Sequence, residues 1–570
     1  MHNLIEPHGG ELKNLCVSGE HASELLSEAL HLASWTLSDA QICDLELLLN
    51  GGFSPLTGYH SQSDYESVLS SMRLADGTLW PIPITLSVDQ SFATAVHLGD
   101  RIVLRNKEGR ALAVLTVSDR WQPDNATEAQ AIFGTQNQSH PGVSALIRRR
   151  NEIVLGGPVE GLELPRHYDF SAFRHTPGQL RSLFQKLGWL NVAAFQTRNL
   201  MHRANFELTV RAAADHNTKL LIHPVVGQTL PGELDPFTRV RCYQKLLSKY
   251  VPGTAMLNLL PLAMRMAGPR EALWHVIIQK NFGCNQFIMG PDHASPQPSS
   301  RGDNYYKPYA AQELVDQFAD ELGVTLIKTP KLVYNTNRAE YQSVDGVPPG
   351  EQTLEISPSE LRHRLDKGLE IPEWFSFPEI ITELRKTVPP VIQRGFTVFF
   401  TGLSGSGKST LANGLFVKLM EDGGRPVTLL DGDVVRTHLS SELGFSKEQR
   451  SVNVRRIGYV ASEITKNGGI AICAPIAPYE DDRQFNRDLI SRYGGYIEIF
   501  VNTPISECEK RDVKGLYAKA RQGLIKEFTG IDDPYEIPRD PTMVVETVGM
   551  KSEELVQEIL LKIRQLGYLK

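Results

Sequence analysis

The chain has 570 residues, which is too long for one hydrophobic core and predicts about three or four domains. The hydrophobic content of 41% and the charged content of 22% are ordinary for a soluble globular protein. The net charge of -7 and the sequence pI near 6.2 argue against a protein that mainly binds nucleic acid, although a local cluster of Arg and Lys can still bind small anions.

The six cysteines are scattered along the chain and form no Cys-x-x-Cys pair. This pattern favours free buried thiols in a reducing compartment over disulfides or a zinc site. The first residues show no basic segment followed by an apolar one, so no signal peptide is expected, and no apolar run is long enough to span a bilayer. We therefore expect a cytoplasmic protein with no membrane partner.

From the first residue to about 165, short strand-like runs are broken by Gly, Pro and Asp. Residues 80–88 and 100–105 are the clearest of these runs, and residues 106–109 form a turn between strands. A helix is expected over 39–49. This pattern predicts a β-rich domain, and no residue motif in this segment looks catalytic.

From about 170 to 325 the pattern becomes α/β. Residues 191–195, 220–224 and 286–290 are expected strands, and a helix is expected to run through Ala213. Each strand ends in a polar or glycine-containing loop. Because ligands of an open parallel sheet lie at the carboxyl ends of its strands, these loops are candidate binding segments.

Residues 396–400 form a short aromatic and β-branched run typical of a buried strand, and apolar residues after Lys408 recur at helical spacing. Between them, residues 402–409 fit the spacing G-x-x-x-x-G-K-[ST]. A chance glycine turn would not need the flanking strand and helix, so a nucleoside triphosphate site is favoured. Lys408 would reach the β- and γ-phosphates, and the Ser409 hydroxyl would hold Mg²⁺. The expected ATP-binding residues are Gly402, Ser404, Gly405, Ser406, Gly407, Lys408, Ser409 and Thr410.

These clusters resemble those of fused ATP sulfurylase and adenylylsulfate (APS) kinase proteins, and the resemblance covers nearly the whole chain. It rests on the loop above, on an Asp-Gly-Asp segment at 431–433 and on sulfurylase-type motifs at 50–58, 196–199, 223–224, 231–232, 238–243, 264–271 and 292–294. The resemblance implies a multidomain α/β fold. The implied domains are a β-rich, PUA-like domain over 1–168, a nucleotidyltransferase-type α/β domain over 169–325, a small third domain with a linker over 326–392, and a P-loop kinase domain with a parallel sheet over 393–570.

The resemblance also implies two reactions. The sulfurylase part would convert ATP and sulfate into APS and pyrophosphate, and the kinase part would phosphorylate the 3′-hydroxyl of APS to give PAPS. It implies ATP, sulfate and APS as partners, Mg²⁺ as the cofactor, and a homo-oligomer, with no nucleic acid. A P-loop kinase acting on another small hydroxyl compound is the runner-up, and an adenine clamp made by Phe445, Asn453 and Phe528 speaks against it.

For the sulfurylase site, the resemblance implies that Arg198 clamps sulfate and that Asn199 contacts phosphate, with His202 as a third catalytic residue. The implied nucleotide- and sulfate-binding residues are Gln196, Thr197, Arg198, Asn199, His202, His293, Ala294 and Val333.

The sulfurylase motifs depart from the family pattern at three positions. Leu200 replaces a Pro, Asn205 replaces the second His of a His-x-x-His pair, and Pro291 replaces an Arg. Losing a charged contact at Asn205 and Pro291 predicts a weak sulfurylase. The alternative is that the N-terminal two-thirds is a non-catalytic nucleotide-binding module that regulates or scaffolds the kinase.

The kinase motifs show no such departure at the phosphates. The resemblance implies that Asp431 and Asp433 serve Mg²⁺ and the acceptor hydroxyl, one of them as general base. Where many relatives have a Ser that can be phosphorylated, this chain has Ala477, so direct in-line transfer from ATP is expected. The implied APS-binding residues are Arg436, Phe445, Arg450, Asn453, Lys514 and Phe528.

Overall fold

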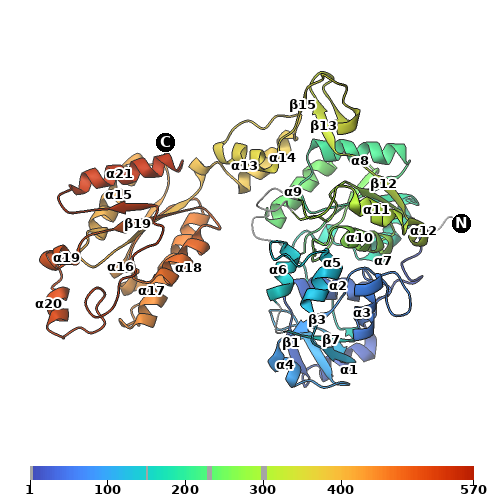
Figure 1. Ribbon diagram of the computed structural model, residues 1–570, viewed down its shortest axis with the longest axis horizontal. Helices are drawn as coiled ribbons and strands as arrows, with labels where there is room; N and C mark the ends of the chain where they lie inside the picture. Colours follow the sequence, from blue (N-terminus) through green and yellow to red (C-terminus); the bar gives the residue numbers. More distant parts are fainter. Residues whose placement is uncertain (1–3, 149–151, 228–233, 297–303) are drawn as a thin grey trace. The chain divides into compact units, whose positions relative to one another are not determined.

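The computed structural model describes residues 4–148, 152–227, 234–296 and 304–570 (Figure 1). The chain divides into two compact units, Met1–Ile356 with Pro372–Leu384, and Ser357–Ile371 with Arg385–Lys570. Within the described residues, no helix is long and apolar enough to cross a membrane. All six cysteines carry free thiols, and all but Cys16 are buried.

The first unit begins with a seven-stranded sheet whose path runs β1-β4-β5-β7-β2, with β3 and β6 also pairing with β7. The strands are β1 (Ala33–Thr36), β2 (Gly58–Tyr59), β3 (Leu86–Val88), β4 (Arg101–Arg105), β5 (Ala111–Thr116), β6 (Asp119–Trp121) and β7 (Ile153–Gly161). The helices are α1 (Gly19–Glu28), α2 (Asp39–Leu49), α3 (Gln62–Ser71), α4 (Gln90–Thr94), α5 (Asn125–Phe133) and α6 (Pro141–Arg148).

The helix predicted over 39–49 is confirmed as α2, and the strand predicted over 100–105 is confirmed as β4. The strand predicted over 80–88 is too long, because only Leu86–Val88 pairs, as β3. Pro81 and Pro83 have no N–H to donate to a neighbouring strand, which keeps the preceding residues out of the sheet.

The second part of the first unit is a parallel five-stranded sheet in the order β10-β9-β8-β11-β12. The strands are β8 (Val192–Thr197), β9 (Lys219–Pro224), β10 (Ala255–Leu257), β11 (Gln286–Met289) and β12 (Thr325–Lys328). The helices are α7 (Pro177–Leu187), α8 (Arg203–Asp215), α9 (Pro236–Leu247), α10 (Pro269–Asn281), α11 (Ala310–Asp316) and α12 (Ala319–Leu322). The predicted α/β texture and its three strands are confirmed, with ends displaced by one or two residues.

The strand order of this sheet decides where a ligand can bind. The chain leaves β8 to one side through β9 and β10, and returns to the other side of β8 as β11. The order therefore reverses between β8 and β11. In open α/β sheets, the crevice for ligands lies outside the carboxyl ends of the strands at such a reversal.

A small antiparallel sheet follows, in the order β14-β13-β15. Its strands are β13 (Leu332–Asn335), β14 (Glu340–Ser343) and β15 (Thr353–Leu354), and two helices come next, α13 (Pro358–Lys367) and α14 (Pro378–Thr387). The hydroxyl of Tyr341 on β14 donates to the carbonyl of Trp374, which ties this sheet to the segment before α14.

The second unit is built on a parallel sheet in the order β17-β18-β16-β19-β20. The strands are β16 (Phe396–Thr401), β17 (Val427–Asp431), β18 (Ile470–Ala474), β19 (Gly495–Val501) and β20 (Met543–Val545). The helices are α15 (Lys408–Asp422), α16 (Gly432–Leu439), α17 (Lys447–Lys466), α18 (Glu480–Ile490), α19 (Ile505–Arg511), α20 (Leu516–Arg521) and α21 (Ser552–Gln565). Helices α15 and α21 pack on one face and α17 on the other (Figure 1).

Strand β16 is buried along its whole length at the centre of this sheet. The predicted strand over 396–400 and the predicted start of a helix at Lys408 are both confirmed. The strand order again reverses at β16, between β18 and β19, so the loop that leaves β16 lies at a position suited to a ligand.

Candidate active sites

The loop between β16 and α15 has the backbone of a phosphate-binding turn. Gly402 and Gly407 take φ angles of +149° and +108°, which residues other than glycine rarely adopt. A Cβ atom at Gly402 would lie 2.6 Å from the carbonyl oxygen of Val501. The remaining predicted ATP-binding residues, Ser404 to Ser406 and Lys408 to Thr410, lie in the same turn and the first turn of α15.

Lys408 folds back over this loop. Its Nζ atom donates to the carbonyl oxygens of Gly402 at 2.9 Å and Leu403 at 2.7 Å, and the residue is 6% exposed. Burial lowers the pKa of Lys408 to about 8. A phosphate at this place would replace the two carbonyls and favour the charged form of the lysine.

Three oxygen-bearing side chains meet beside Lys408. The Ser409 hydroxyl donates to Oδ2 of Asp431 at 2.8 Å, and Oδ1 of Asp431 accepts the N–H of Asp433 at 3.0 Å. The carboxylate of Asp433 forms an ion pair with Lys514. Hydroxyl and carboxylate oxygens are the ligands that Mg²⁺ prefers, so Ser409 and Asp431 fit the predicted cation.

The predicted APS-binding residues of α17 carry buried polar atoms without a partner. Arg450 donates from Nη1 to Thr529 Oγ1 at 2.7 Å and lies 3.1 Å from Asp533. Its Nε and Nη2 atoms, and Oδ1 of Asn453, are buried and have no hydrogen-bond partner among the described residues. Buried polar atoms are nearly always paired, so this arrangement is suited to a polar ligand.

The other predicted APS-binding residues lie around these two. The Arg436 guanidinium stacks 4.4 Å from the centre of the Phe445 ring, and this ring is 67% exposed. Phe528 contacts the ring of Tyr517 at 5.1 Å. Tyr517 was not predicted, yet its hydroxyl donates to the carbonyl of Ser404 at 2.9 Å and so ties this segment to the P-loop.

At the other candidate site, Gln196 and Thr197 stand at the carboxyl end of β8. Gln196 is 4% exposed; its Oε1 atom accepts from Gln279 of α10 at 2.8 Å, and its Nε2 atom has no partner among the described residues. The hydroxyl of Thr197 lies 3.1 Å from both the N–H and the carbonyl oxygen of Asn199. The segment Gln196–Asn199 therefore forms a tight turn with one buried amide left to bind a ligand.

His202 and Asn205 do not act as a matched pair. Nδ1 of His202 lies 2.9 Å from the Ser376 hydroxyl, its ring packs 4.5 Å from the ring of Phe375, and burial lowers its pKa to about 4. Oδ1 of Asn205 accepts the N–H of His202 at 3.4 Å, so Asn205 caps the start of α8. The sequence reasoning did not foresee this capping role.

His293 follows β11, the strand that pairs with β8. Its Nε2 atom lies 2.9 Å from Nδ1 of His275 on α10, and burial lowers the pKa of His293 well below its usual value. Ala294 takes a φ of +58°, and the carbonyl of Pro291 accepts the N–H of Tyr309 at 2.9 Å. His275 is a further residue that the sequence reasoning missed.

The last predicted residue of the sulfurylase site is Val333. It sits on β13 and pairs with Gln342 of β14 in the small sheet. Its role in the sulfurylase site stays a prediction.

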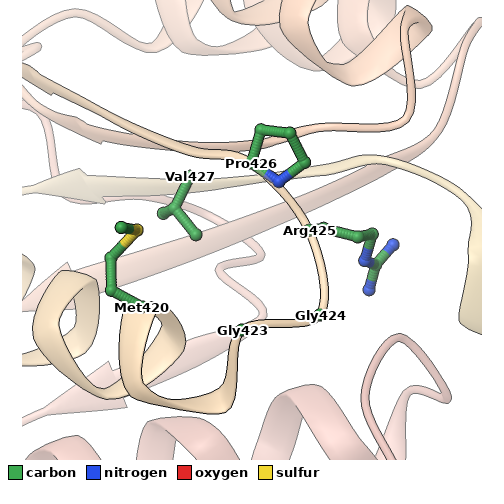
Figure 2. A pocket seen from close by; sticks show the side chains of 6 residues that line it. All are labelled: Met420, Gly423, Gly424, Arg425, Pro426 and Val427. Atoms are coloured by element: carbon green, nitrogen blue, oxygen red, sulfur yellow. The ribbon is translucent and has the colours of Figure 1, made fainter.

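A surface hollow of the second unit lies at the end of α15 remote from the P-loop. Figure 2 shows its lining residues, which are Met420, Gly423, Gly424, Arg425, Pro426 and Val427. The one charged side chain among them, Arg425, donates to the carbonyls of Arg394 and Tyr568. The hollow is therefore not part of either candidate active site.

Comparisons with known proteins match three successive segments to families. Residues 5–164 match a PUA-like domain, residues 171–387 match ATP-sulfurylase, and residues 394–546 match adenylylsulphate kinase. The chain is 50% identical over 568 residues to a sulfate adenylyltransferase of Chaetomium globosum and 49% identical over 566 residues to one of Aspergillus oryzae, with 99% of each chain covered in both cases. It is also similar to a solved hexameric APS kinase from Thiobacillus denitrificans, with a TM-score of 0.82, 41% identity, and 100% of this chain and 99% of that chain covered.

Proposed function

This chain belongs to the family of fused sulfate adenylyltransferases and APS kinases, and from that premise we propose which residues carry its two reactions. Both parts are transferases that act in the activation of sulfate. The alternative of a non-catalytic N-terminal module is not favoured, because sulfate adenylyltransferases match the chain over 99% of its length.

In the kinase, the γ-phosphoryl group of ATP passes to the 3′-oxygen of APS, and ADP leaves. The backbone from Gly402 to Gly407 and the ammonium of Lys408 hold the β- and γ-phosphates. Ser409 and Asp431 would hold Mg²⁺, whose charge offsets that of the phosphates. Asp433 accepts the proton of the attacking hydroxyl once APS has displaced Lys514 from it.

The substrate APS is held by side chains that now lack a partner or are exposed. Arg450 and Asn453 offer buried polar atoms to the sulfophosphate and the nucleoside. Arg436, Phe445 and Phe528 supply a guanidinium and two aromatic faces for the adenine. The Lys514 ammonium closes the site from the segment after α19.

In the sulfurylase, a sulfate oxygen attacks the α-phosphorus of ATP, and pyrophosphate leaves. Arg198 clamps sulfate, while Asn199 and His293 contact the nucleotide phosphates. His202 acts as a neutral donor, since burial lowers its pKa to about 4. Gln196 directs its unpaired Nε2 atom to the ligand because Gln279 holds its other end.

The observation that carries the proposal is the meeting of Lys408, Ser409 and Asp431 at the carboxyl ends of β16 and β17. The test uses the full chain and measures both reactions in the same samples. Lys408→Ala should abolish PAPS formation from added APS and leave pyrophosphate release unchanged. Arg198→Ala should abolish pyrophosphate release and leave PAPS formation from added APS unchanged.

Lys418→Ala is the matched control, because Lys418 lies on the same helix and pairs only with Glu421 among the described residues. It should leave both reactions unchanged. A Lys408→Ala chain that still phosphorylates APS would remove the P-loop from the proposal. A circular dichroism spectrum equal to that of the parent chain shows that the fold is kept.

We further propose a homo-oligomer, since the similar Thiobacillus denitrificans protein is described as hexameric, and light scattering tests this. A cytoplasmic location suits six free thiols. We propose domain boundaries near 168, 325 and 392, which limited proteolysis tests.

A further inference from the structure

Helix α9 places two buried side chains beneath the loop that carries Arg198 and Asn199. The Nη1 atom of Arg239 donates to the carbonyl of Arg198 at 2.9 Å, and the Tyr243 hydroxyl donates to the carbonyl of Asn199 at 2.5 Å. Arg239 is 4% exposed and Tyr243 is 1% exposed. The two donors lie one helical turn apart, so they face the same side of α9.

Arg239 also joins the loops after two neighbouring strands. The same Nη1 atom lies 3.3 Å from the carbonyl of Val225, just beyond β9, while Arg198 follows β8. Its Nε atom is buried and has no partner among the described residues. Burying a guanidinium costs free energy unless its charge is paired and its donors are hydrogen-bonded, and among the described residues Arg239 hydrogen-bonds only to main-chain carbonyls.

We propose that Arg239 and Tyr243 are positioning residues for adenylyl transfer, an inference that rests on the proposed roles of Arg198 and Asn199. By fixing the two carbonyls, they fix the direction in which the side chains of Arg198 and Asn199 leave the backbone. The residue after Asn199 is Leu200, whose φ is not locked by a ring as that of a proline would be, so the two hydrogen bonds restrain a loop that its own sequence leaves free to move.

The charge of Arg239 adds to its positioning role. A guanidinium directly beneath the anion site raises the electrostatic potential where sulfate and the α-phosphate meet. Since the group is buried, salt screens it less than it would screen a surface arginine.

Tyr243→Phe is the sharpest test, because it removes only the hydroxyl. Tyr250→Phe is the matched control: Tyr250 is also buried, and its hydroxyl bonds to Thr209 at 2.7 Å, not to the loop. Tyr243→Phe should lower kcat/KM for sulfate by about 3- to 10-fold, the worth of one hydrogen bond. Tyr250→Phe should leave kcat/KM unchanged, and the kinase rate of both chains should equal that of the parent.

Arg239→Lys tests the second contact, since lysine keeps the charge but lacks the planar guanidinium group whose Nη1 atom reaches both carbonyls. A displaced loop should lower kcat/KM for sulfate by about 10- to 100-fold. Arg181→Lys is the control, because Arg181 also donates to main-chain carbonyls, those of Asn281, Ile5 and Lys280, in the same unit. It should leave the sulfurylase rate unchanged.

Combined variants distinguish the positioning role of Tyr243 from a purely structural one. If Tyr243 acts through the loop, Tyr243→Phe should have a smaller effect in an Arg198→Lys chain, where the clamp is already misplaced. An undiminished effect in that chain, or Tyr243→Phe and Arg239→Lys chains that match their controls, would overturn the positioning role. Arg198→Ala distinguishes a failure of the positioning role from a failure of the proposed sulfate site. If Arg198→Ala leaves pyrophosphate release intact, the proposed sulfate site itself is wrong.

Discussion

The Nζ atom of Lys408 lies 2.9 Å from the carbonyl oxygen of Gly402, at the start of the loop that Lys408 ends. The lysine that should bind phosphate is therefore held by its own loop. Burial lowers the pKa of Lys408 to about 8, so the side chain is charged near neutral pH and loses its proton at a slightly higher pH. We expect ATP binding to exchange the carbonyls for phosphate oxygens, which would favour the charged form.

The first prediction is a proton uptake linked to ATP binding by the kinase. Because the pKa of Lys408 is about 8 in the free protein and rises when phosphate arrives, a proton is taken up on binding at a pH above about 8. Correspondingly, kcat/KM for ATP in APS phosphorylation should fall as pH rises through about 8, since this parameter reports the free protein.

Calorimetry in buffers of different ionisation enthalpy measures the uptake directly. Lys408→Met should remove it, and Lys418→Met, which changes an exposed lysine of the same helix, should keep it. Uptake that persists in the Lys408→Met chain would assign the proton to another group.

The parts of the fold that follow from local pattern could be predicted from the sequence. The P-loop, its strand and its helix are all encoded within residues 396–422, and each appears where expected. The predicted strand over 80–88 is longer than the observed one, because the prediction relied on the spacing of apolar residues. Pro81 and Pro83 have no N–H to hydrogen-bond to a neighbouring strand, so the pairing is confined to the residues after them. Boundaries set by such competition are poorly specified by spacing alone.

The contacts that hold the loop of Arg198 and Asn199 could not be predicted from the sequence. Arg239 reaches the carbonyl of a residue 41 positions away, and a main-chain carbonyl carries no signature in the sequence. Similarly, His275 on α10 meets His293, which lies 18 residues further along the chain in the loop after β11. Asn205 was judged by a lost charge, whereas the structure gives it a capping bond to His202.

The second prediction concerns Ala477, which takes a φ of +46° and is 1% exposed. Its carbonyl accepts from Arg483 at 2.7 Å. Because in-line transfer needs no phosphoenzyme, Ala477→Ser should change the kinase rate by less than about 2-fold. Ala477→Gly is the control for backbone strain and should also keep the rate. A large gain in the serine chain, with acid-stable label from γ-labelled ATP, would show that the parent lacks a useful intermediate.

The third prediction is an acid-sensitive first unit. Burial lowers the pKa values of His60, His202 and His223 from 6.5 to about 4, so these side chains are neutral when folded. As pH falls below 6.5, the unfolded chain binds protons first, and stability present above 6.5 is lost towards pH 4. Each histidine costs up to about 1.4 kcal/mol per pH unit in that window.

Calorimetry at about pH 7 and about pH 5 measures this loss. His60→Gln should reduce the difference in unfolding temperature between the two pH values. His97→Gln should preserve it, because the His97 side chain is 78% exposed. Equal differences in the parent and in His60→Gln would remove His60 from the explanation.

The fourth prediction concerns two of the three positions at which the sulfurylase departs from the family pattern, Asn205 and Pro291. Asn205 uses its amide oxygen to accept the N–H of His202 at 3.4 Å, and Pro291 has no N–H and accepts the N–H of Tyr309 with its carbonyl. Neither residue brings a charge to the phosphates. Each missing contact is worth about 2–4 kcal/mol if it acts like a single oxyanion donor, although such effects need not add.

Asn205→His should therefore raise sulfate-dependent pyrophosphate release only modestly, because the imidazole restores a donor while the helix loses its amide cap and Pro291 still withholds a charge. Asn205→His with Pro291→Arg should exceed either single change, and adding Arg198→Ala should abolish the gain. The kinase rate of each chain serves as the control for folding. If the parent already releases pyrophosphate at an ordinary enzymatic rate, of order 1–10³ per second, or if the double change gains nothing over the single ones, these two positions do not limit the reaction. Asn205 would then be a tolerated variant of the motif whose role is to cap α8.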